Sequence, residues 1–192
     1  MVDIDIPKPK SILFVCIGNV IRSPFCEGLF IKIMKDIGYD QNITCSSAAI
    51  GAKDIGRKPR RGAIKLAKTE GFDISNHKSR KITKKDFLTF NLIVSLEPPV
   101  YNALLQVKPI ESKAEIVEFI PKIAVINPYS GLMKDYKMMH EQITKGMPIF
   151  IRKHFGINCV RNEPIMNITN DPYQSYINDS INIEKQKETN DG

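Results

Sequence analysis

The sequence predicts a single α/β domain in which helices cover both faces of a four-stranded parallel sheet. Two observations support this fold class. Short apolar runs of buried-strand length recur along the chain, and stretches with a helical spacing of apolar residues separate them. A chain of 192 residues can bury a substantial core within one domain.

Each expected element has a local reason. The first apolar run, SILFVCI, ends at the Gly-Asn pair that follows it, and Pro24 suits the first turn of the next helix. Gly71 is placed to end a helix. Gly146 and Pro148 should kink or split the last helix. The expected strands are residues 11–17, 43–49, 92–96 and 123–126, and the expected helices are one that begins at Ser23, then 62–71, 101–106 and 135–155.

The alternation of strands and helices favours parallel pairing and therefore a doubly wound sheet of the flavodoxin-like type. Loops that carry chemistry are expected at the carboxyl ends of the strands. Residues 1–10 are expected to form an N-terminal arm, and residues 11–157 the domain. Residues 158–192 are Asn-rich and show no apolar period, which predicts a flexible or loosely docked tail.

The charge distribution limits the classes of partner. The formal net charge is +7 and the isoelectric point is about 9.2, which favours anionic partners. The tail holds six acidic and three basic residues, so the positive excess lies before it. Nucleic acid is disfavoured, because the chain lacks interleaved aromatic residues and a recognition-helix pattern.

No membrane partner is expected, because no apolar stretch reaches the length of about 20 residues that spans a bilayer. The first residues, MVDIDIPKPKS, contain no apolar run of signal-peptide length. A cytoplasmic location is therefore expected.

The cysteines disfavour both a disulfide framework and a zinc site. The four cysteines form no Cys-x-x-Cys pair, and they are too few for a disulfide scaffold. The three histidines lie at scattered positions, so no structural metal site is expected. The cysteines are Cys16, Cys26, Cys45 and Cys159.

The segment VCIGNVIRSPFCEG, residues 15–28, carries the strongest chemical signal. Cys16 follows directly on a buried strand, and Arg22 comes after five intervening residues, with Ser23 next. Inward N–H groups of a tight loop at a helix N-terminus can bind phosphate oxygens. The positive helix end and Arg22 would stabilise a Cys16 thiolate, and the guanidinium can hold two phosphate oxygens. Ser23 can donate a hydrogen bond to the sulfur.

A cysteine and an arginine at this spacing would also recur by chance, and buried free cysteines are common. The full order of strand, Cys-x-x-Asn-x-x-Arg-Ser-Pro and helix is far more specific. Gly18 and Asn19 tolerate the positive φ angles that such a loop is expected to need. Binding of phosphate or a similar oxyanion is therefore the favoured interpretation.

This segment resembles the signature of low-molecular-weight protein tyrosine phosphatases, and the similarity continues over roughly residues 10–155. SSAAIGAKDIGRKP resembles the second strand and variable loop of that family. SRKITKKDFLTFNLIVSLE resembles its helix and third strand, and NPYSG falls where the family has an Asp-Pro-Tyr-Tyr-Gly loop.

The resemblance implies roles for individual residues. Cys16 would attack phosphorus to form a phosphocysteine, and Arg22 would bind the equatorial oxygens. No cofactor or metal is implied, because the loop amides and Arg22 neutralise the phosphate charge. The implied phosphate-binding residues are Ile17, Gly18, Asn19, Val20, Ile21 and Arg22, and the implied loop-supporting residues are Asn19, Ser23, Ser47, His77 and Glu27.

Asn127 is the most consequential departure from the family pattern. The family has an aspartate before that proline, which protonates the leaving phenolate and then deprotonates the attacking water. Asparagine has no proton to exchange at neutral pH, so slow hydrolysis of phosphotyrosine is expected. Candidate substitutes are Asp171, in the Asp-Pro-Tyr sequence of the tail, and Glu97, although support of the site is the favoured role for Glu97.

The expected substrate pocket departs as well. Tyr129 keeps one aromatic wall, Ser130 replaces the second, and Lys53 stands where many relatives carry an aromatic residue. A basic rim would favour acidic phosphorylated segments. The alternative interpretation, equally favoured, is that these residues form an ordinary solvated basic loop. The rim residues are Lys53, Arg57, Lys58, Arg60 and Arg61.

Ile21 replaces a second cysteine that many relatives carry before the arginine, which removes a possible disulfide with the nucleophile. Cys26 is expected to pack in the core. Arsenate reductases share this fold and loop, but they need resolving cysteines. Cys45 and Cys159 offer no close pair for that chemistry.

Three functions remain open at this point. The favoured one is a protein tyrosine phosphatase or aryl phosphomonoester hydrolase that forms a phosphocysteine, acts on a phosphorylated protein or small aryl phosphate, and is slowed by Asn127. The alternative is a pseudophosphatase that binds phosphorylated or other anionic partners without efficient turnover. A nucleic-acid-binding domain is a remote third option.

Overall fold

The computed structural model describes residues 11–39 and 43–159, so the predicted arm and most of the predicted tail lie outside the described residues. The strands are β1 (Ser11–Cys16), β2 (Thr44–Ala49), β3 (Leu92–Ser95) and β4 (Glu115–Glu118). The helices are α1 (Arg22–Asp36), α2 (Arg61–Thr69), α3 (Lys84–Thr89), α4 (Pro98–Val107) and α5 (Met133–Phe155), with the 3-10 turn η2 (Pro128–Ser130) before the last.

The four strands form one parallel sheet in the order β2-β1-β3-β4. The chain leaves β1 for its neighbour on one side and then crosses to β3 on the other. The carboxyl ends of β1 and β3 therefore flank a topological switch point, where doubly wound folds bind ligands. Cys16 is the last residue of β1, so the strand order places it at that switch point.

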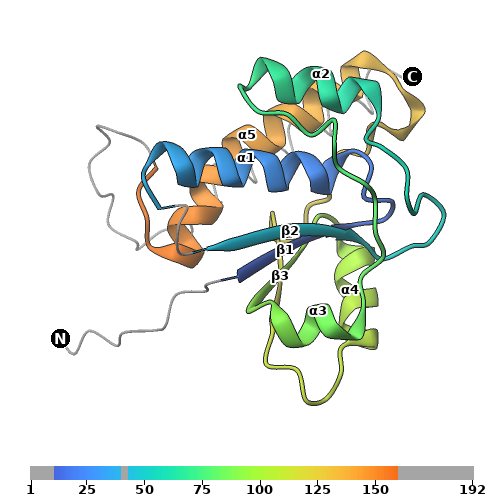
Figure 1. Cartoon of the computed structure of the whole chain (residues 1–192), viewed down its shortest axis with the longest axis vertical. Coiled ribbons are helices and arrows are strands. Elements are labelled where there is room, and N and C mark those ends of the chain that lie inside the picture. The colour runs from blue at the N-terminus through green and yellow to red at the C-terminus, as the bar shows by residue number, and fades with distance from the viewer. Residues whose placement is uncertain (1–10, 40–42, 160–192) are drawn as a thin grey trace.

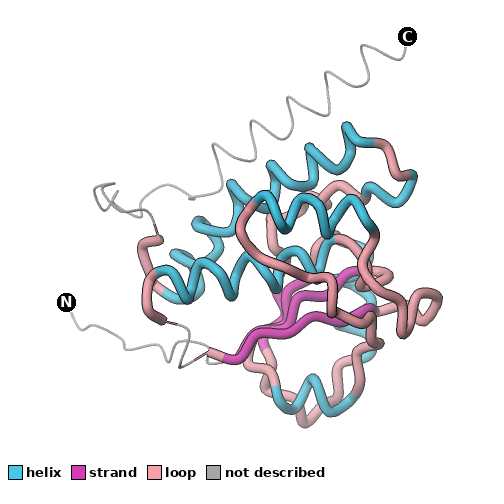
Figure 2. The backbone as a smooth tube through the Cα atoms, turned by 45° about the horizontal axis from the view of Figure 1, so that its top comes forward, coloured by secondary structure: helices cyan, strands magenta, loops and turns pink. Residues whose placement is uncertain are grey.

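Helices cover both faces of the sheet, as Figures 1 and 2 show, with α1, α2 and α5 on one face and α3 and α4 on the other. The central strand β1 serves both layers because successive side chains alternate between faces. Ile12 and Phe14 pack in the cluster under α1 and α5, whereas Leu13 and Val15 pack with α3 and α4. All four side chains are fully buried, which explains the continuous apolar run.

The predicted fold class and most predicted elements are confirmed. The strands expected at 11–17, 43–49 and 92–96 correspond to β1, β2 and β3. The helices expected after Ser23 and over 62–71 correspond to α1 and α2, and Gly71 has the left-handed φ of 81° that suits a helix end. The helix expected over 101–106 begins earlier, because Pro98 and Pro99 fit the first turn of α4.

The prediction of a fourth strand at residues 123–126 is wrong. The fourth strand is β4, whose sequence EIVE has a glutamate at each end and the buried Ile116 and half-buried Val117 between them, as suits the edge of a sheet. Residues 123–126 instead run past the end of β3, where the Val125 N–H donates to the Leu96 carbonyl at 2.8 Å. The run is apolar because it packs against the α1 and α5 side of the core, not because it joins the sheet.

The last helix is not split at Gly146 and Pro148, which was one of the two outcomes predicted there. Helix α5 continues from Met133 to Phe155 with Pro148 inside it. Met147, Phe150 and Ile151 are fully buried, and this packing offsets the hydrogen bond lost at proline, about 3 kcal/mol. Gly146 has a packing role, because a Cβ there would come within 3.1 Å of the Phe119 ring.

Within residues 11–39 and 43–159, no helix combines the length and apolarity needed to cross a membrane.

His154 makes the stability of the fold depend on pH. Its ring lies 4.5 Å from the Phe150 ring, and burial, helped by the Lys153 charge, lowers the pKa of His154 from 6.5 to about 4. Between these values the unfolded chain binds a proton that the native state does not, so stability falls as the pH drops from 6.5 to 4. His154→Gln should reduce this loss, measured as the unfolding free energy from urea titrations at each pH.

Lys137→Gln is the matched control, because it removes an exposed charge from the same helix without changing the buried imidazole or its neighbour. An unchanged difference in stability between pH 7 and pH 4 in His154→Gln would contradict the assignment.

Candidate functional site

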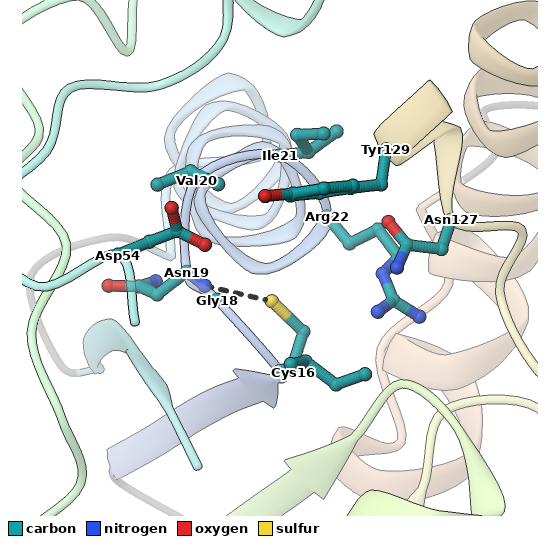
Figure 3. A pocket seen from close by; sticks show the side chains of 10 residues that line it. Cys16, Gly18, Asn19, Val20, Ile21, Arg22, Asp54, Asn127 and Tyr129 are labelled. Atoms are coloured by element: carbon teal, nitrogen blue, oxygen red, sulfur yellow. Dashed lines mark hydrogen bonds between the residues drawn. The ribbon is translucent and has the colours of Figure 1, made fainter. Parts of the chain in front are cut away.

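The loop between β1 and α1 forms the floor of a pocket at the switch point (Figure 3). The pocket contains about 300 Å³ of empty space, part of it open to solvent. Cys16 is 3% exposed and lies at the bottom. The lining residues are Cys16, Ile17, Gly18, Asn19, Val20, Ile21, Arg22, Asp54, Asn127 and Tyr129.

Positive φ angles were expected at Gly18 and Asn19, and the structure has one at Asn19 only. Asn19 adopts a left-handed φ of 55°, which asparagine tolerates better than most residues. The φ angle of Gly18 is not positive. Its use is spatial, because a Cβ at residue 18 would come within 2.8 Å of the Asp54 Oδ2 atom.

Two hydrogen-bonding groups face the Cys16 sulfur. The Ser23 Oγ atom lies 3.0 Å from Sγ, and the Asn19 backbone N–H donates to Sγ at 3.3 Å. Ser23 is buried in the first turn of α1, so the sulfur lies at the amino end of a 15-residue helix. The helix dipole and both donors stabilise negative charge on sulfur.

The Asn19 side chain is buried and fixed in one orientation. Its Oδ1 atom accepts from the Arg80 backbone N–H at 3.0 Å, and a backbone N–H can only donate. The amide nitrogen must therefore be Nδ2, which donates to Ser23 Oγ at 2.9 Å and Ser47 Oγ at 2.8 Å. Because the Ser23 oxygen already accepts from Asn19, its own hydrogen is free to point at the Cys16 sulfur.

His77 and Glu27 complete this network, and burial shifts the pKa of each toward its neutral form. His77 Nε2 lies 3.0 Å from Asn19 Oδ1, so the imidazole must donate there. Burial lowers the pKa of His77, and the hydrogen bond to Asn19 opposes that shift only in part. Burial likewise raises the pKa of Glu27, against the hydrogen bond that Ser47 donates at 2.5 Å. Both shifts disfavour a charged pair across the 3.8 Å that separates His77 Nδ1 from Glu27.

Arg22 is 2% exposed and is held from behind. One terminal nitrogen lies 2.6 Å from Glu97 Oε1, and the other donates to the Val125 carbonyl at 3.1 Å. Glu97 follows β3 and precedes α4, so the sheet order brings its carboxylate under the guanidinium. This pair neutralises a buried positive charge while leaving Arg22 as part of the pocket wall.

The misassigned segment 123–126 forms a wall of the site. Gln142, on α5, accepts a hydrogen bond from the Ile126 N–H at 2.7 Å and donates to the Ala124 carbonyl at 3.4 Å. This bracing positions Val125 against Arg22 and brings Asn127 to the pocket. The sequence offered no signal for Gln142, because a single glutamine on a helix has no distinctive pattern.

Tyr129 covers the mouth of the pocket, with its ring extended over the loop in Figure 3. Lys53 Nζ lies 5.6 Å and Arg60 Cζ 5.2 Å from the ring centroid, within cation–π range. Lys53 thus belongs to the rim rather than to the pocket lining. Ser130 is exposed and donates to Asp135 at 3.0 Å, away from the lining residues.

The other cysteines do not join this site. Cys26 is fully buried, and burial, reinforced by the neighbouring Cys16 charge, raises its pKa well above the ordinary value. Burial also raises the pKa of Cys45, and it raises that of Cys159 to about 11. Within the described part of the chain, no group of histidine, cysteine or acidic residues is arranged to hold a metal ion.

The structure brings together nearly all the predicted site residues, including the network from Asn19 to Glu27. Asp171 lies outside the described residues. Sequence reasoning missed Asp54, the buried carboxylate in the pocket wall, although it stands directly after Lys53 in the loop that follows β2.

The fold and the site together define a doubly wound α/β protein with a cysteine at the floor of an arginine-lined pocket. The family model described as "Low molecular weight phosphotyrosine protein phosphatase" matches residues 11–155. The chain belongs to this family, whose members are phosphoric monoester hydrolases.

Individual relatives agree. The low molecular weight phosphotyrosine protein phosphatase of Sus scrofa is 32% identical over 151 residues, covering 75% of this chain and 95% of that protein. The Homo sapiens protein of the same description is 33% identical with the same coverage. Among solved structures, Vibrio vulnificus Wzb in complex with benzylphosphonate is 27% identical, has a TM-score of 0.67, and matches 75% of this chain and 98% of its own.

The Asn19 amide should be a major source of stability for the loop. Asn19→Ala would leave the Arg80 N–H without its acceptor, remove the amide donor that Ser23 and Ser47 share, and place alanine at a φ of 55°. Unsatisfied buried groups cost about 1–3 kcal/mol each. The unfolding free energy, measured by urea denaturation, should therefore fall by about 3 kcal/mol.

Asn102→Ala, on the exposed side of α4, is the matched control and should change little. A loss of stability as small as that of the control would mean that Asn19 does not hold the loop.

Proposed function

We propose that this protein hydrolyses phosphotyrosine and related aryl phosphomonoesters through a phosphocysteine at Cys16. The observation that carries the proposal is the position of the sulfur, with two donors at 3.0 and 3.3 Å beneath a pocket lined by Arg22. A thiolate so placed is a nucleophile held at the base of an oxyanion site.

In the first step, the phosphate binds to the loop amides and Arg22, and the Cys16 thiolate attacks phosphorus. A P–S bond forms while the P–O bond to the aryl group breaks, and the leaving oxygen keeps the electron pair. Charge on the equatorial oxygens is met by the fixed guanidinium and by N–H groups that need no reorganisation. The Glu97 contact keeps Arg22 in place before substrate arrives.

In the second step, water attacks phosphorus, and the P–S bond breaks to regenerate the thiolate. The hydroxyl of Ser23 donates to the departing sulfur, because Asn19 already occupies its acceptor side. Asn19, Ser47, His77 and Glu27 act through this serine and through the shape of the loop.

Asn127 limits the cleavage of poor leaving groups. Its side chain is in the pocket wall beside Arg22, as Figure 3 shows, but an amide cannot deliver a proton to a phenolate. General acid–base help contributes about 10²–10⁴ in rate. Phosphotyrosine turnover should therefore be slower than it would be with an aspartate at this position.

The rim favours phosphorylated segments with acidic neighbours. Lys53 and Arg60 both lie over the Tyr129 ring, so positive charge surrounds the mouth through which a peptide would enter. Arg57 and Arg61 add exposed charges on the same loop and helix start.

A pseudophosphatase is the second candidate, and Asn127 is the observation that favours it. The same loop would then capture a phosphorylated partner and release it unchanged. The two functions differ in whether Cys16 forms a covalent phosphoenzyme.

A leaving-group series separates these functions. With 2,4-dinitrophenyl phosphate, rapid mixing should give a burst of phenolate equal to the enzyme concentration, and turnover should slow as the leaving group becomes poorer, from this ester to phenyl phosphate and phosphotyrosine. Asn127→Asp should raise kcat/KM for the poor leaving groups and leave that for 2,4-dinitrophenyl phosphate nearly unchanged, because it adds a proton donor at this position.

Cys16→Ser is the matched control and should abolish the burst while still binding inorganic phosphate. Phosphate binding without any burst in the wild-type protein would favour the pseudophosphatase. Activity that persists in Cys16→Ser would overturn both functions.

The basic rim can be tested with paired phosphotyrosine peptides, one flanked by acidic residues and one by neutral residues. Lys53→Glu should lower the ratio of their kcat/KM values by about fivefold to tenfold, and 0.5 M salt should reduce the wild-type ratio in the same direction. Lys113→Glu, on the connection before β4, supplies the charge control. Equal ratios in wild type and Lys53→Glu would remove the rim from substrate selection.

A further inference from the structure

Asp54 is a buried carboxyl residue in the pocket that has no role in the two chemical steps described above. It lies in the connection between β2 and α2, is 4% exposed and lines the same pocket as Cys16 and Arg22. In Figure 3 its carboxyl group lies on the side of the pocket opposite Asn127, with the Cys16 sulfur between them. An acidic side chain in the wall of an anion-binding pocket is unfavourable while charged, so its presence calls for a chemical reason.

The partners of Asp54 do not explain its burial. Its Oδ1 atom is buried and accepts no hydrogen bond from any described residue. Among residues 11–39 and 43–159, the one cation that forms an ion pair with it is Arg57, at 3.7 Å from Oδ1, and the Arg57 side chain is 62% exposed. Such a long, solvent-screened contact is worth little. A dianionic phosphate in the loop would place a second negative group beside Asp54, in the same pocket.

The direction of the reaction requires a proton donor on the mouth side of the pocket. An in-line displacement places the leaving oxygen on the side of phosphorus opposite the sulfur, which faces Tyr129 in Figure 3. Asn127 is in the wall there but cannot supply a proton. Glu97 lies behind Arg22 and is held by it at 2.6 Å, so it cannot serve either. Asp54 is the acidic residue among those that line the pocket.

We propose that Asp54 is the proton donor to the leaving group. It would take the role of the aspartate that the family has at the position of Asn127. This inference rests on the proposed phosphatase function. It names a catalytic carboxyl on the opposite wall of the pocket, brought there by the loop after β2 rather than by the loop before α5.

The proton balance closes over one turnover. As the P–S bond forms and the P–O bond breaks, the carboxyl of Asp54 gives its proton to the aryl oxygen and becomes a carboxylate. That carboxylate then takes a proton from the water that attacks phosphorus, while the P–S bond breaks and Cys16 leaves as the thiolate. Inorganic phosphate is released, and Asp54 is protonated again.

Asp54→Asn tests the proposal through leaving-group dependence. The variant should lower kcat/KM for phenyl phosphate by about 10²- to 10⁴-fold, because an unaided phenolate must depart. The loss with 2,4-dinitrophenyl phosphate should be much smaller, and the burst from Cys16 should persist, which shows that the variant folds and attacks. The basic limb of the wild-type pH profile with phenyl phosphate should disappear.

A double-mutant cycle separates proton transfer from a structural or binding role. In the Asn127→Asp background, Asp54→Asn should have only a small effect, because the new aspartate supplies the proton. Asp36→Asn, an exposed aspartate at the end of α1, is the matched control. Arg57→Ala tests whether Asp54 acts only by anchoring its loop.

Two results would overturn the proposal while leaving the phosphatase function intact. One is an equal loss on both aryl phosphates and in both backgrounds, and the other is an Arg57→Ala variant that reproduces the full leaving-group effect. Absence of a burst from the wild-type protein would instead overturn the phosphatase function itself, and the role of Asp54 with it.

Discussion

The site depends on the orientation of one buried amide, that of Asn19. The Arg80 backbone N–H can only donate, so it fixes which end of the amide faces the serines. From that single constraint the direction of each further hydrogen bond follows, through Ser23 to the Cys16 sulfur and through Ser47 to Glu27. The Ser23 hydroxyl that donates to the sulfur is thus oriented, through Asn19, by the backbone N–H of Arg80, which is 61 residues from Asn19 in the sequence.

A second constraint is the burial of a positive charge. Arg22 is almost fully enclosed, which would be costly without a partner, and the switch point between β1 and β3 supplies one in Glu97. Because this carboxylate approaches from behind, it balances the guanidinium without filling the pocket. The site can therefore stay assembled when empty, and an incoming phosphate meets donors that are already in position.

The sequence predicted the sheet well where strands are buried on both faces, because a strand such as β1 must then be continuously apolar. It failed at the fourth strand, since the edge segment EIVE carries charges and the apolar run at 123–126 packs without joining the sheet. It also allowed a split of the last helix at Pro148, although the buried face of α5 outweighs the local cost of proline and the helix is continuous. In each case tertiary burial overrode a local pattern.

For the site, the sequence by itself determined the proposed nucleophile and the arginine and serine beside it, because Cys16, Arg22 and Ser23 share one loop whose geometry is local. Sequence reasoning favoured a supporting role for Glu97, but only the tertiary structure placed its carboxylate behind the guanidinium and Asp54 in the opposite wall. Those neighbours come from separate connections at the carboxyl end of the sheet. Their meeting depends on strand order and on how each connection packs, which no spacing within one segment encodes.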